Sequence, residues 1–253
     1  MDYQFCARTD PGRVRGNNED AVAFDAAVGL CVLADGLGGH NAGEVASQMA
    51  TATVCEHLAE WLRAPGRPTG SAVLGQAMQA CVLQVHRDIQ RQAKVNPRQA
   101  GMSSTLVVGV FEGEQLVLGH IGDSRCYRWR EGVLTQITKD HSRVQEQVDA
   151  GLLTPEQAAT AAHRNLITRA LGAGSQVELE LHEHLVRPHD IYLMCSDGLS
   201  DMVSETEMKR ILSTAQPLEQ RAQALVDAAN ARGGRDNVTV LLAWAKSAAE
   251  GQA

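Results

Sequence analysis

Residues 29–36 read Gly29-Leu30-Cys31-Val32-Leu33-Ala34-Asp35-Gly36, an unbroken apolar run that stops at an Asp-Gly pair. A strand with one face in water alternates apolar and polar residues, whereas a strand covered on both faces is apolar throughout. A second run of this kind, Ile191 to Cys195, is followed by Ser196-Asp197-Gly198. We therefore expect two buried strands, each followed by an aspartate and a glycine.

Further short apolar runs are bounded by Gly and Asp, which is typical of strands. They are Thr105 to Phe111, Gln115 to Ile121, Arg125 to Trp129, Val177 to Leu181 and Val238 to Trp244. Apolar residues switch to a period of three and four in two segments, 45–62 and 74–89, which predicts two amphipathic helices. The Pro- and Gly-rich segment 63–70 is the expected turn, so the two helices should lie side by side, antiparallel, on one sheet face.

Later helices are expected at 143–150, after Pro155, at 204–212 and at 217–231, with a capping box at Ser204 and Glu207 and Pro217 as the first helical residue. The segment from about 140 to 165 is polar and helical with few large apolar residues, which predicts a small surface flap. With no internal repeat and no linker, the pattern favours one domain over residues 1–253, with strands sandwiched by helices.

Composition excludes several classes. The chain has 253 residues, 44% of them hydrophobic, and 30 acidic against 23 basic residues give a net charge of −7. Such a chain can bury a core, and it has no basic run that could neutralise nucleic-acid phosphates. Six dispersed cysteines form no ligand spacing and indicate free thiols, and no apolar stretch approaches the ~18 residues of a membrane span. We expect a cytoplasmic protein with no membrane and no nucleic-acid partner.

Acidic residues mark the ends of several expected strands. Asp35 and Asp197 follow strands, whereas Asp236 and the pair Glu19-Asp20 precede them. If these strands alternate in direction, the carboxylates gather at one edge. A cluster of like charges needs a cation, and an all-oxygen cluster suits Mg²⁺ or Mn²⁺. The alternative for any single Asp-Gly pair is a simple turn after a strand.

Seven motifs, taken together and in order, resemble the PPM, or type 2C, metal-dependent protein serine/threonine phosphatases in their compact bacterial form. They are residues 9–20 (TDPGRVRGNNED), 34–40 (ADGLGGH), 101–105 (GMSST), 122–125 (GDSR), 164–172 (RNLITRALG), 195–199 (CSDGL) and 234–239 (GRDNVT).

The resemblance implies an α+β, four-layer αββα sandwich of two mostly antiparallel sheets flanked by helix pairs, with a two-metal centre for Mn²⁺ or Mg²⁺ at one end. It implies that Asp35 bridges both ions, that the Gly36 carbonyl binds one of them, and that Asp197 and Asp236 complete the other. Glu19 and Asp20 would act through bound waters. Asp123 matches the ligand of a weaker third metal, shared with Asp197.

The resemblance also gives Arg15, four residues before Glu19, the role of binding the substrate phosphate. A guanidinium fork pairs with two phosphate oxygens at once, so the residue type suits the task. The implied reaction is direct attack by a water that bridges the two metals, without a phosphoenzyme. The implied substrates are phosphoserine and phosphothreonine proteins, with a bacterial Ser/Thr kinase as the opposing partner and a monomer as the working form.

Two alternatives remain at this level: a catalytically weak relative that binds phosphoproteins, and a phosphatase for small phosphate esters. The chain also departs from the family pattern. Animal members have a histidine, proposed as the acid for the leaving group, where this chain has Leu37. His40 could reach the site or could simply belong to a helical N-terminal turn, and we expect His141 to be structural.

Overall fold

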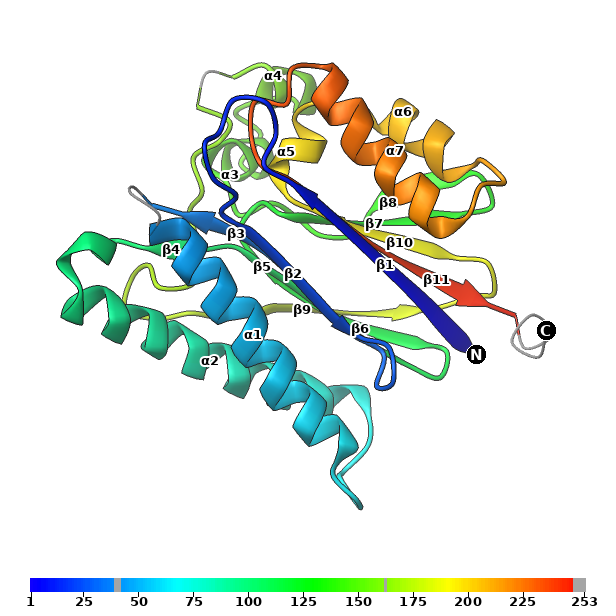
Figure 1. Ribbon diagram of the computed structural model, residues 1–253, viewed down its shortest axis with the longest axis horizontal. Coiled ribbons are helices and arrows are strands. Elements are labelled where there is room, and N and C mark those ends of the chain that lie inside the picture. Colours follow the sequence, from blue (N-terminus) through cyan, green and yellow to red (C-terminus); the bar gives the residue numbers. More distant parts are fainter. Residues whose placement is uncertain (39–41, 162, 248–253) are drawn as a thin grey trace.

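Two antiparallel sheets face each other at the centre of the molecule, as the computed structural model shows for residues 1–38, 42–161 and 163–247 (Figure 1). One sheet has the order β1 (Asp2–Asp10), β11 (Val238–Lys246), β10 (Ile191–Cys195), β7 (Arg125–Arg130) and β8 (Val133–Gln136). The other has the order β2 (Asp20–Asp25), β3 (Leu30–Leu37), β5 (Leu106–Glu112), β6 (Gln115–Ile121) and β9 (Glu180–Leu185), and β4 (Ser103–Ser104) pairs with β3. The prediction about His40 lies outside the described residues.

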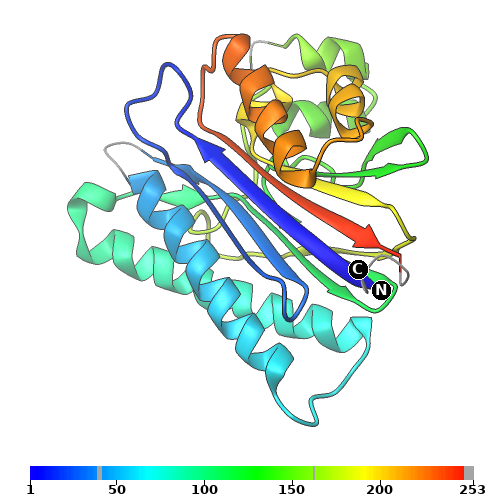
Figure 2. The ribbon, with the colours of Figure 1, turned by 45° about the vertical axis from the view of Figure 1, so that its right-hand side comes forward.

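Helices cover the outer face of each sheet (Figures 1 and 2). The second sheet carries α1 (Ala42–Arg63) and α2 (Ser71–Val95), followed by the short turn η1 (Pro97–Gln99). The first sheet carries α5 (Asp197–Ser200), α6 (Glu205–Leu212) and α7 (Leu218–Ala231). The segment predicted to be a flap, residues 140–165, contains α3 (Arg143–Asp149) and α4 (Pro155–Ala159). None of the helices in the described ranges is long and apolar enough to cross a membrane.

Three apolar layers hold the elements together. The layer between the sheets includes Phe5, Leu33 and Tyr192, and two further layers lie between each sheet and its helices. Alternate residues of β3 enter different layers: Val32 packs toward α1 and α2, and Leu33 toward the other sheet. This division explains the unbroken apolar run, and the predicted α+β sandwich is confirmed.

The structure corrects three details of the sequence prediction. Asp35 and Gly36 do not follow their strand but lie within β3, because Gly36 and Leu37 pair with Ser104 and Ser103 of β4. The strand expected at 177–181 is instead β9, which begins at Glu180. Pro217 is the residue before α7 rather than its first residue.

The cap predicted for α6 forms on the serine side. The Ser204 hydroxyl accepts a hydrogen bond from the Glu207 amide at 3.3 Å. This bond satisfies one of the amide donors that have no partner within the first turn of a helix.

Candidate metal centre

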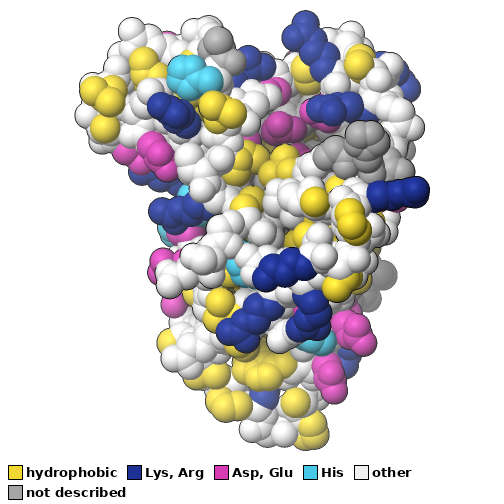
Figure 3. All heavy atoms as spheres, turned by 90° about the vertical axis from the view of Figure 1, so that its left-hand side faces the viewer, with side chains coloured by type: hydrophobic (Ala, Val, Ile, Leu, Met, Phe, Trp, Pro, Cys, Tyr) yellow, Lys and Arg dark blue, Asp and Glu magenta, His cyan; other side chains and the backbone are white. Residues whose placement is uncertain are grey.

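The predicted acidic residues meet at one end of the two sheets. Asp20 and Asp35 are direct partners in the register of β2 and β3. Asp197 follows β10 as the first residue of α5, and Asp236 lies two residues before β11. A cavity of about 240 Å³ is lined by Arg15, Glu19, Asp35, Gly36, Leu37, Asn165, Asp197, Asp236 and others. Figure 3 shows acidic side chains sunk in a hollow on this side of the molecule, with Lys and Arg side chains around it.

The backbone of Asp35 is held by Thr105. The Asp35 amide donates to Thr105 Oγ1, the Thr105 amide donates back to the Asp35 carbonyl, both at 2.9 Å, and Thr105 in turn bonds Ser124. Gly36 packs so closely that a Cβ would lie 2.1 Å from the Gly43 carbonyl oxygen. Only glycine fits here, so the chain beside Asp35 is fixed by both hydrogen bonding and packing.

A hydroxyl bridge joins the two sheets beneath the cavity. Ser196 Oγ donates to Asp20 Oδ2 at 2.7 Å and accepts from the Thr239 amide at 3.0 Å. Asp20 is buried, and its other oxygen, Oδ1, has no hydrogen-bond partner among the described residues. Asp20, the register partner of Asp35, therefore keeps one carboxylate oxygen without a donor.

Close backbone packing brings Asp197 next to Asp236. A Cβ on Gly198 would lie 1.9 Å from the Asn237 carbonyl oxygen, so only glycine allows this approach. The Asn237 side chain accepts from the Glu19 amide at 2.8 Å and donates to the carbonyls of Pro11 and Asn17. One amide side chain thus fixes the loop that carries Arg15 and Glu19 against the strand that follows Asp236.

Burial and the closeness of like charges disfavour the ionised forms of these carboxyl groups. Burial and the charges of Asp20, Asp197 and other acidic neighbours raise the pKa of Asp35 well above its ordinary value, and burial together with Asp123 and Asp236 does the same for the pKa of Asp197. Burial raises the pKa of Asp20 to about 6, although the Ser196 hydrogen bond opposes the change. Several carboxyls this close cannot all be ionised unless positive charge enters the cavity.

Arg15 is the basic side chain that reaches this cavity from the 11–19 loop. Its Nη2 lies 2.7 Å from Asp236 Oδ2, and about half of its side chain, 54%, is exposed. The guanidinium neutralises only one carboxylate, and it retains free N–H donors that face solvent. Arg15 is thus accessible to an anion that enters the cavity.

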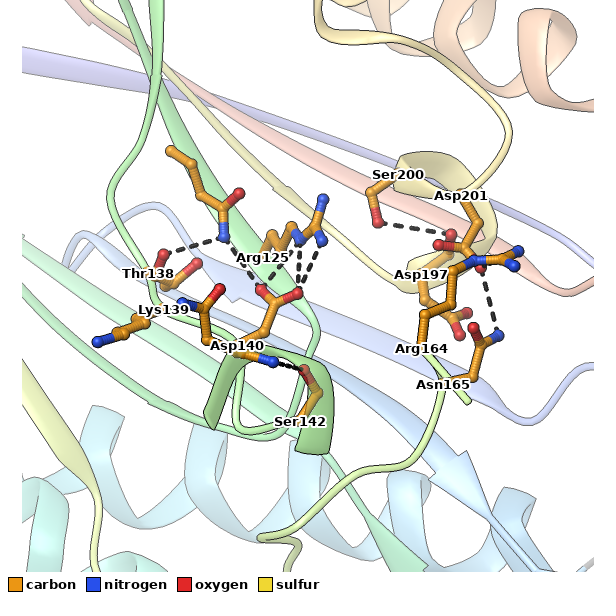
Figure 4. A network of polar contacts seen from close by, with 12 residues as sticks. Arg125, Thr138, Lys139, Asp140, Ser142, Arg164, Asn165, Asp197, Ser200 and Asp201 are labelled. Carbon is orange, nitrogen blue, oxygen red and sulfur yellow. Dashed lines mark hydrogen bonds and ion pairs between the residues drawn. The ribbon is translucent and has the colours of Figure 1, made fainter. Parts of the chain in front are cut away.

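Asp123 faces a second, larger cavity of about 680 Å³ that lies between the flap and α5 and shares Asp197 with the first cavity. Burial and the charge of Asp140 raise the pKa of Asp123 to about 7, with Arg125 opposing, and Asp123 Oδ1 has no partner among the described residues. In Figure 4, Asp140 pairs with Arg125 on one side of this cavity, while Arg164 and Asn165 bond Asp201 on the other.

The structure therefore brings every predicted site residue to this end of the sheets. Asp20 is the register partner of Asp35, and Asp123 lines the second cavity. Their metal and phosphate roles remain predictions. Thr105, Ser196 and Asn237, which fix these residues in place, were not predicted from the sequence. Each lies within one of the seven motifs, so the motifs point to these positions although not to their partners.

Comparison with known proteins gives a consistent result. The family model described as Protein phosphatase 2C matches residues 13–239. Serine/threonine protein phosphatase PstP of Mycobacterium tuberculosis is 44% identical over 240 residues, which are 95% of this chain and 44% of PstP. Serine/threonine phosphatase stp of Listeria monocytogenes is 36% identical over 238 residues, 93% of each chain. This chain thus spans less than half the length of PstP.

Among solved structures, the catalytic domain of serine threonine protein phosphatase PstP in complex with 2 manganese ions matches with a TM-score of 0.84 and 43% identity. The match covers 97% of this chain and 99% of that one.

Proposed function

The chain belongs to the protein phosphatase 2C family, and from this premise we propose that it is a metal-dependent phosphatase that removes phosphate from phosphoserine and phosphothreonine in proteins. The observation that carries the proposal is the buried carboxylate cluster, in which burial and the charges of neighbouring aspartates raise the pKa values of Asp35 and Asp197. Asp20 and Asp123 each keep an oxygen with no donor among the described residues. Such a cluster is stable in its charged form only with cations bound.

The donor set fits hard divalent cations. Every candidate ligand supplies oxygen, and no histidine or cysteine lines the smaller cavity in the described ranges, which favours Mn²⁺ or Mg²⁺ over softer metals. The manganese complex of the PstP catalytic domain supports the same choice. We assign Asp35 and the Gly36 carbonyl to one ion and Asp35, Asp197 and Asp236 to the other, with Glu19 and Asp20 acting through water. Asp123 and Asp197 would hold a weaker third ion.

The chemistry that the ions supply when bound is an activated water for in-line attack on phosphorus. The protein's own part is to bind and orient the ester. Arg15 would pair two phosphate oxygens through its guanidinium fork and stabilise the charge that develops on them. Because Arg15 now bonds Asp236 at 2.7 Å, the same contact sets its distance from the cluster before substrate arrives.

A protein substrate is favoured over a small ester by the second cavity. It holds about 680 Å³ beside Asp197 and is lined by the flap, which is more space than a phosphate group alone needs. Leu37 lines the smaller cavity and cannot donate a proton, so the leaving group must receive its proton from another group.

We also infer the setting in which the enzyme works. The chain would form one catalytic domain with its flap, act as a monomer in cytoplasmic signalling, and oppose a Ser/Thr kinase. The described cysteines are all free thiols, which supports a reducing compartment.

The test is phosphate release from a phosphothreonine peptide by metal-stripped protein, with Mn²⁺, Mg²⁺, Ca²⁺ or EDTA. We expect Mn²⁺ or Mg²⁺ to restore turnover in the wild type and not in Asp197→Asn. Asp227→Asn, which changes an exposed aspartate on α7, is the matched control and should behave as the wild type. A folded wild type that is inactive with every metal would instead favour a phosphoprotein-binding role. Release from p-nitrophenyl phosphate but not from the peptide would favour small esters.

A further inference from the structure

A cluster of histidines lies near the acidic cavities but outside them, at the edge where β6 meets β9. His120 is the direct register partner of Glu180. The ring of His120 stacks on His141 with centroids 4.7 Å apart, and on His182 at 5.9 Å. Glu180 accepts hydrogen bonds from His141 Nε2 and His182 Nε2, each at 3.0 Å.

The ligand atoms of His120, His141 and Glu180 lie within 4.8 Å of one another, as in a metal site, but the hydrogen positions argue against one. The Gly122 amide donates to His141 Nδ1 at 3.1 Å, so this nitrogen carries the lone pair. The ring hydrogen of neutral His141 is therefore on Nε2, where it is donated to Glu180. His141 has no free nitrogen left for a metal ion, and the cluster is a hydrogen-bond network.

This network is hydrogen-bonded to the turn that carries Asp123. His141 bonds Gly122 twice, through its amide to the Gly122 carbonyl at 2.9 Å and through Nδ1 to the Gly122 amide. Gly122 has φ +101°, and a Cβ there would lie 2.7 Å from Thr105 Cγ2, so the turn needs glycine. On the other side of Asp123, Ser124 bonds Thr105 at 2.7 Å. Asp123 is thus held between two fixed residues.

The same histidine also fixes the segment that follows the flap. The Thr168 amide donates to the His141 carbonyl at 2.8 Å, and the Arg143 amide donates to Leu166 at 2.9 Å. Between these contacts lies Ile167, which lines the smaller cavity. His120 supports this arrangement, because its Nε2 lies 2.8 Å from the Lys139 carbonyl and its ring covers that of His141.

We propose that His141, oriented by Glu180, is a positioning residue: it sets the place of the Asp123 carboxylate, and so the affinity for the ion that Asp123 and Asp197 would share, without contacting substrate. This proposal rests on the proposed function for the identity of that ion. It replaces the expectation that His141 is merely structural.

Two substitutions test the two ring nitrogens of His141 separately. His141→Asn keeps an acceptor near the position of Nδ1 and loses the donor to Glu180, whereas His141→Gln keeps a donor near Nε2 and loses the acceptor for Gly122. The readout is a Mn²⁺ titration followed by electron paramagnetic resonance of the free ion, which counts bound ions and gives the affinity of the tight pair and of the weaker site. Thermal unfolding checks the fold.

We expect His141→Gln and His141→Ala to weaken the third site by about tenfold, the size of one net hydrogen bond, and His141→Asn to stay within about threefold of the wild type. Affinity for the tight pair should not change in any of them. Glu180→Gln, which keeps an acceptor for the imidazole, should resemble the wild type. Glu180→Ala should weaken the third site, because the imidazole loses the acceptor that keeps its hydrogen on Nε2, whereas the amide side chain of His141→Asn has no tautomer to fix.

Equal third-site affinity in the wild type and His141→Ala would overturn the proposal. So would equal loss in the Asn and Gln variants, or a wild type that binds no third ion at millimolar Mn²⁺. These results do not depend on catalysis, because they measure bound ions. A wild type that binds the ions but releases no phosphate would contradict the proposed function, while the ion affinities of the His141 variants would still decide the role of this residue.

Discussion

Two buried carboxylates in this molecule have opposite surroundings. Asp190, before β10, is 1% exposed in its side chain, and its oxygens accept from Arg130 at 2.7 and 2.6 Å and from the Arg187 amide at 2.8 Å. Asp20, at the other end of the sheets, is also buried but has one hydroxyl donor and one oxygen with no partner among the described residues. Burial alone therefore does not distinguish the two carboxylates. What Asp20 lacks is the cationic partner that Arg130 provides to Asp190.

The largest effect should come from breaking the ion pair between Arg130 and Asp190. Asp190→Ala leaves Arg130, whose side chain is 17% exposed, without its carboxylate partner and leaves the Arg187 amide without its acceptor. We expect the free energy of unfolding to fall by about 3–5 kcal/mol. Urea denaturation measures this, with Asp227→Ala as the exposed control. Turnover per folded molecule should be unchanged. A loss under about 1 kcal/mol would mean that the pair of Asp190 with Arg130 contributes no more to stability than a surface salt bridge.

Asp197→Asn should instead raise the stability of the metal-free protein and lower turnover. Removing one charge from a cluster of like charges should raise the melting temperature of the metal-free protein, while peptide turnover with Mn²⁺ should fall at least about 100-fold. Differential scanning calorimetry and phosphate release measure the two effects. If the metal-free variant melts at a lower temperature than the wild type, charge repulsion among these aspartates does not destabilise the metal-free protein.

Arg15→Ala should reduce kcat/KM for a phosphothreonine peptide by about 10- to 100-fold, the loss expected for a hydrogen bond between charged groups, mainly through a higher KM. Steady-state kinetics at saturating Mn²⁺ test this. Arg15→Lys should recover part of the loss, because it keeps the charge and loses the fork. An unchanged kcat/KM in Arg15→Ala would remove this residue from phosphate binding.

The smallest effect is a pH dependence of the metal-free protein. Burial raises the pKa of Asp20 to about 6 and that of Asp123 to about 7, above the ~3.9 of an unfolded aspartate. The folded state therefore holds more protons than the unfolded state between these values, and its stability falls as pH rises from about 4 through 7. Melting temperatures from pH 5 to 8 should decline without metal and decline less with Mn²⁺. A rise with pH in the metal-free protein would contradict this sign.

The clustered aspartates could be predicted from the sequence, because each lies next to an apolar run that must be a strand, and antiparallel strands bring their ends together. The buried strands β3, β5 and β10 were predictable for the same reason, since few other structures bury consecutive apolar residues.

Contacts between distant segments were not predictable. Thr105, Ser196 and Asn237 act through partners far along the chain, and nothing in their own neighbourhood specifies those partners. The strand predicted at 177–181 starts too early compared with β9. Glu180 and His182 look like surface residues in the sequence, yet they form a hydrogen-bonded pair on the face toward His120. Strand β1 was missed because its place is set by pairing with β11.

We propose that this carboxylate cluster holds two ions and that Asp35 is a ligand of both. The most direct test is the electron paramagnetic resonance spectrum of metal-free protein loaded with two equivalents of Mn²⁺, compared with Asp35→Asn. We expect the spectrum of a magnetically coupled ion pair in the wild type and uncoupled or unbound Mn²⁺ in the variant. Uncoupled ions in the wild type, or a coupled pair that survives in Asp35→Asn, would show that Asp35 does not join two ions.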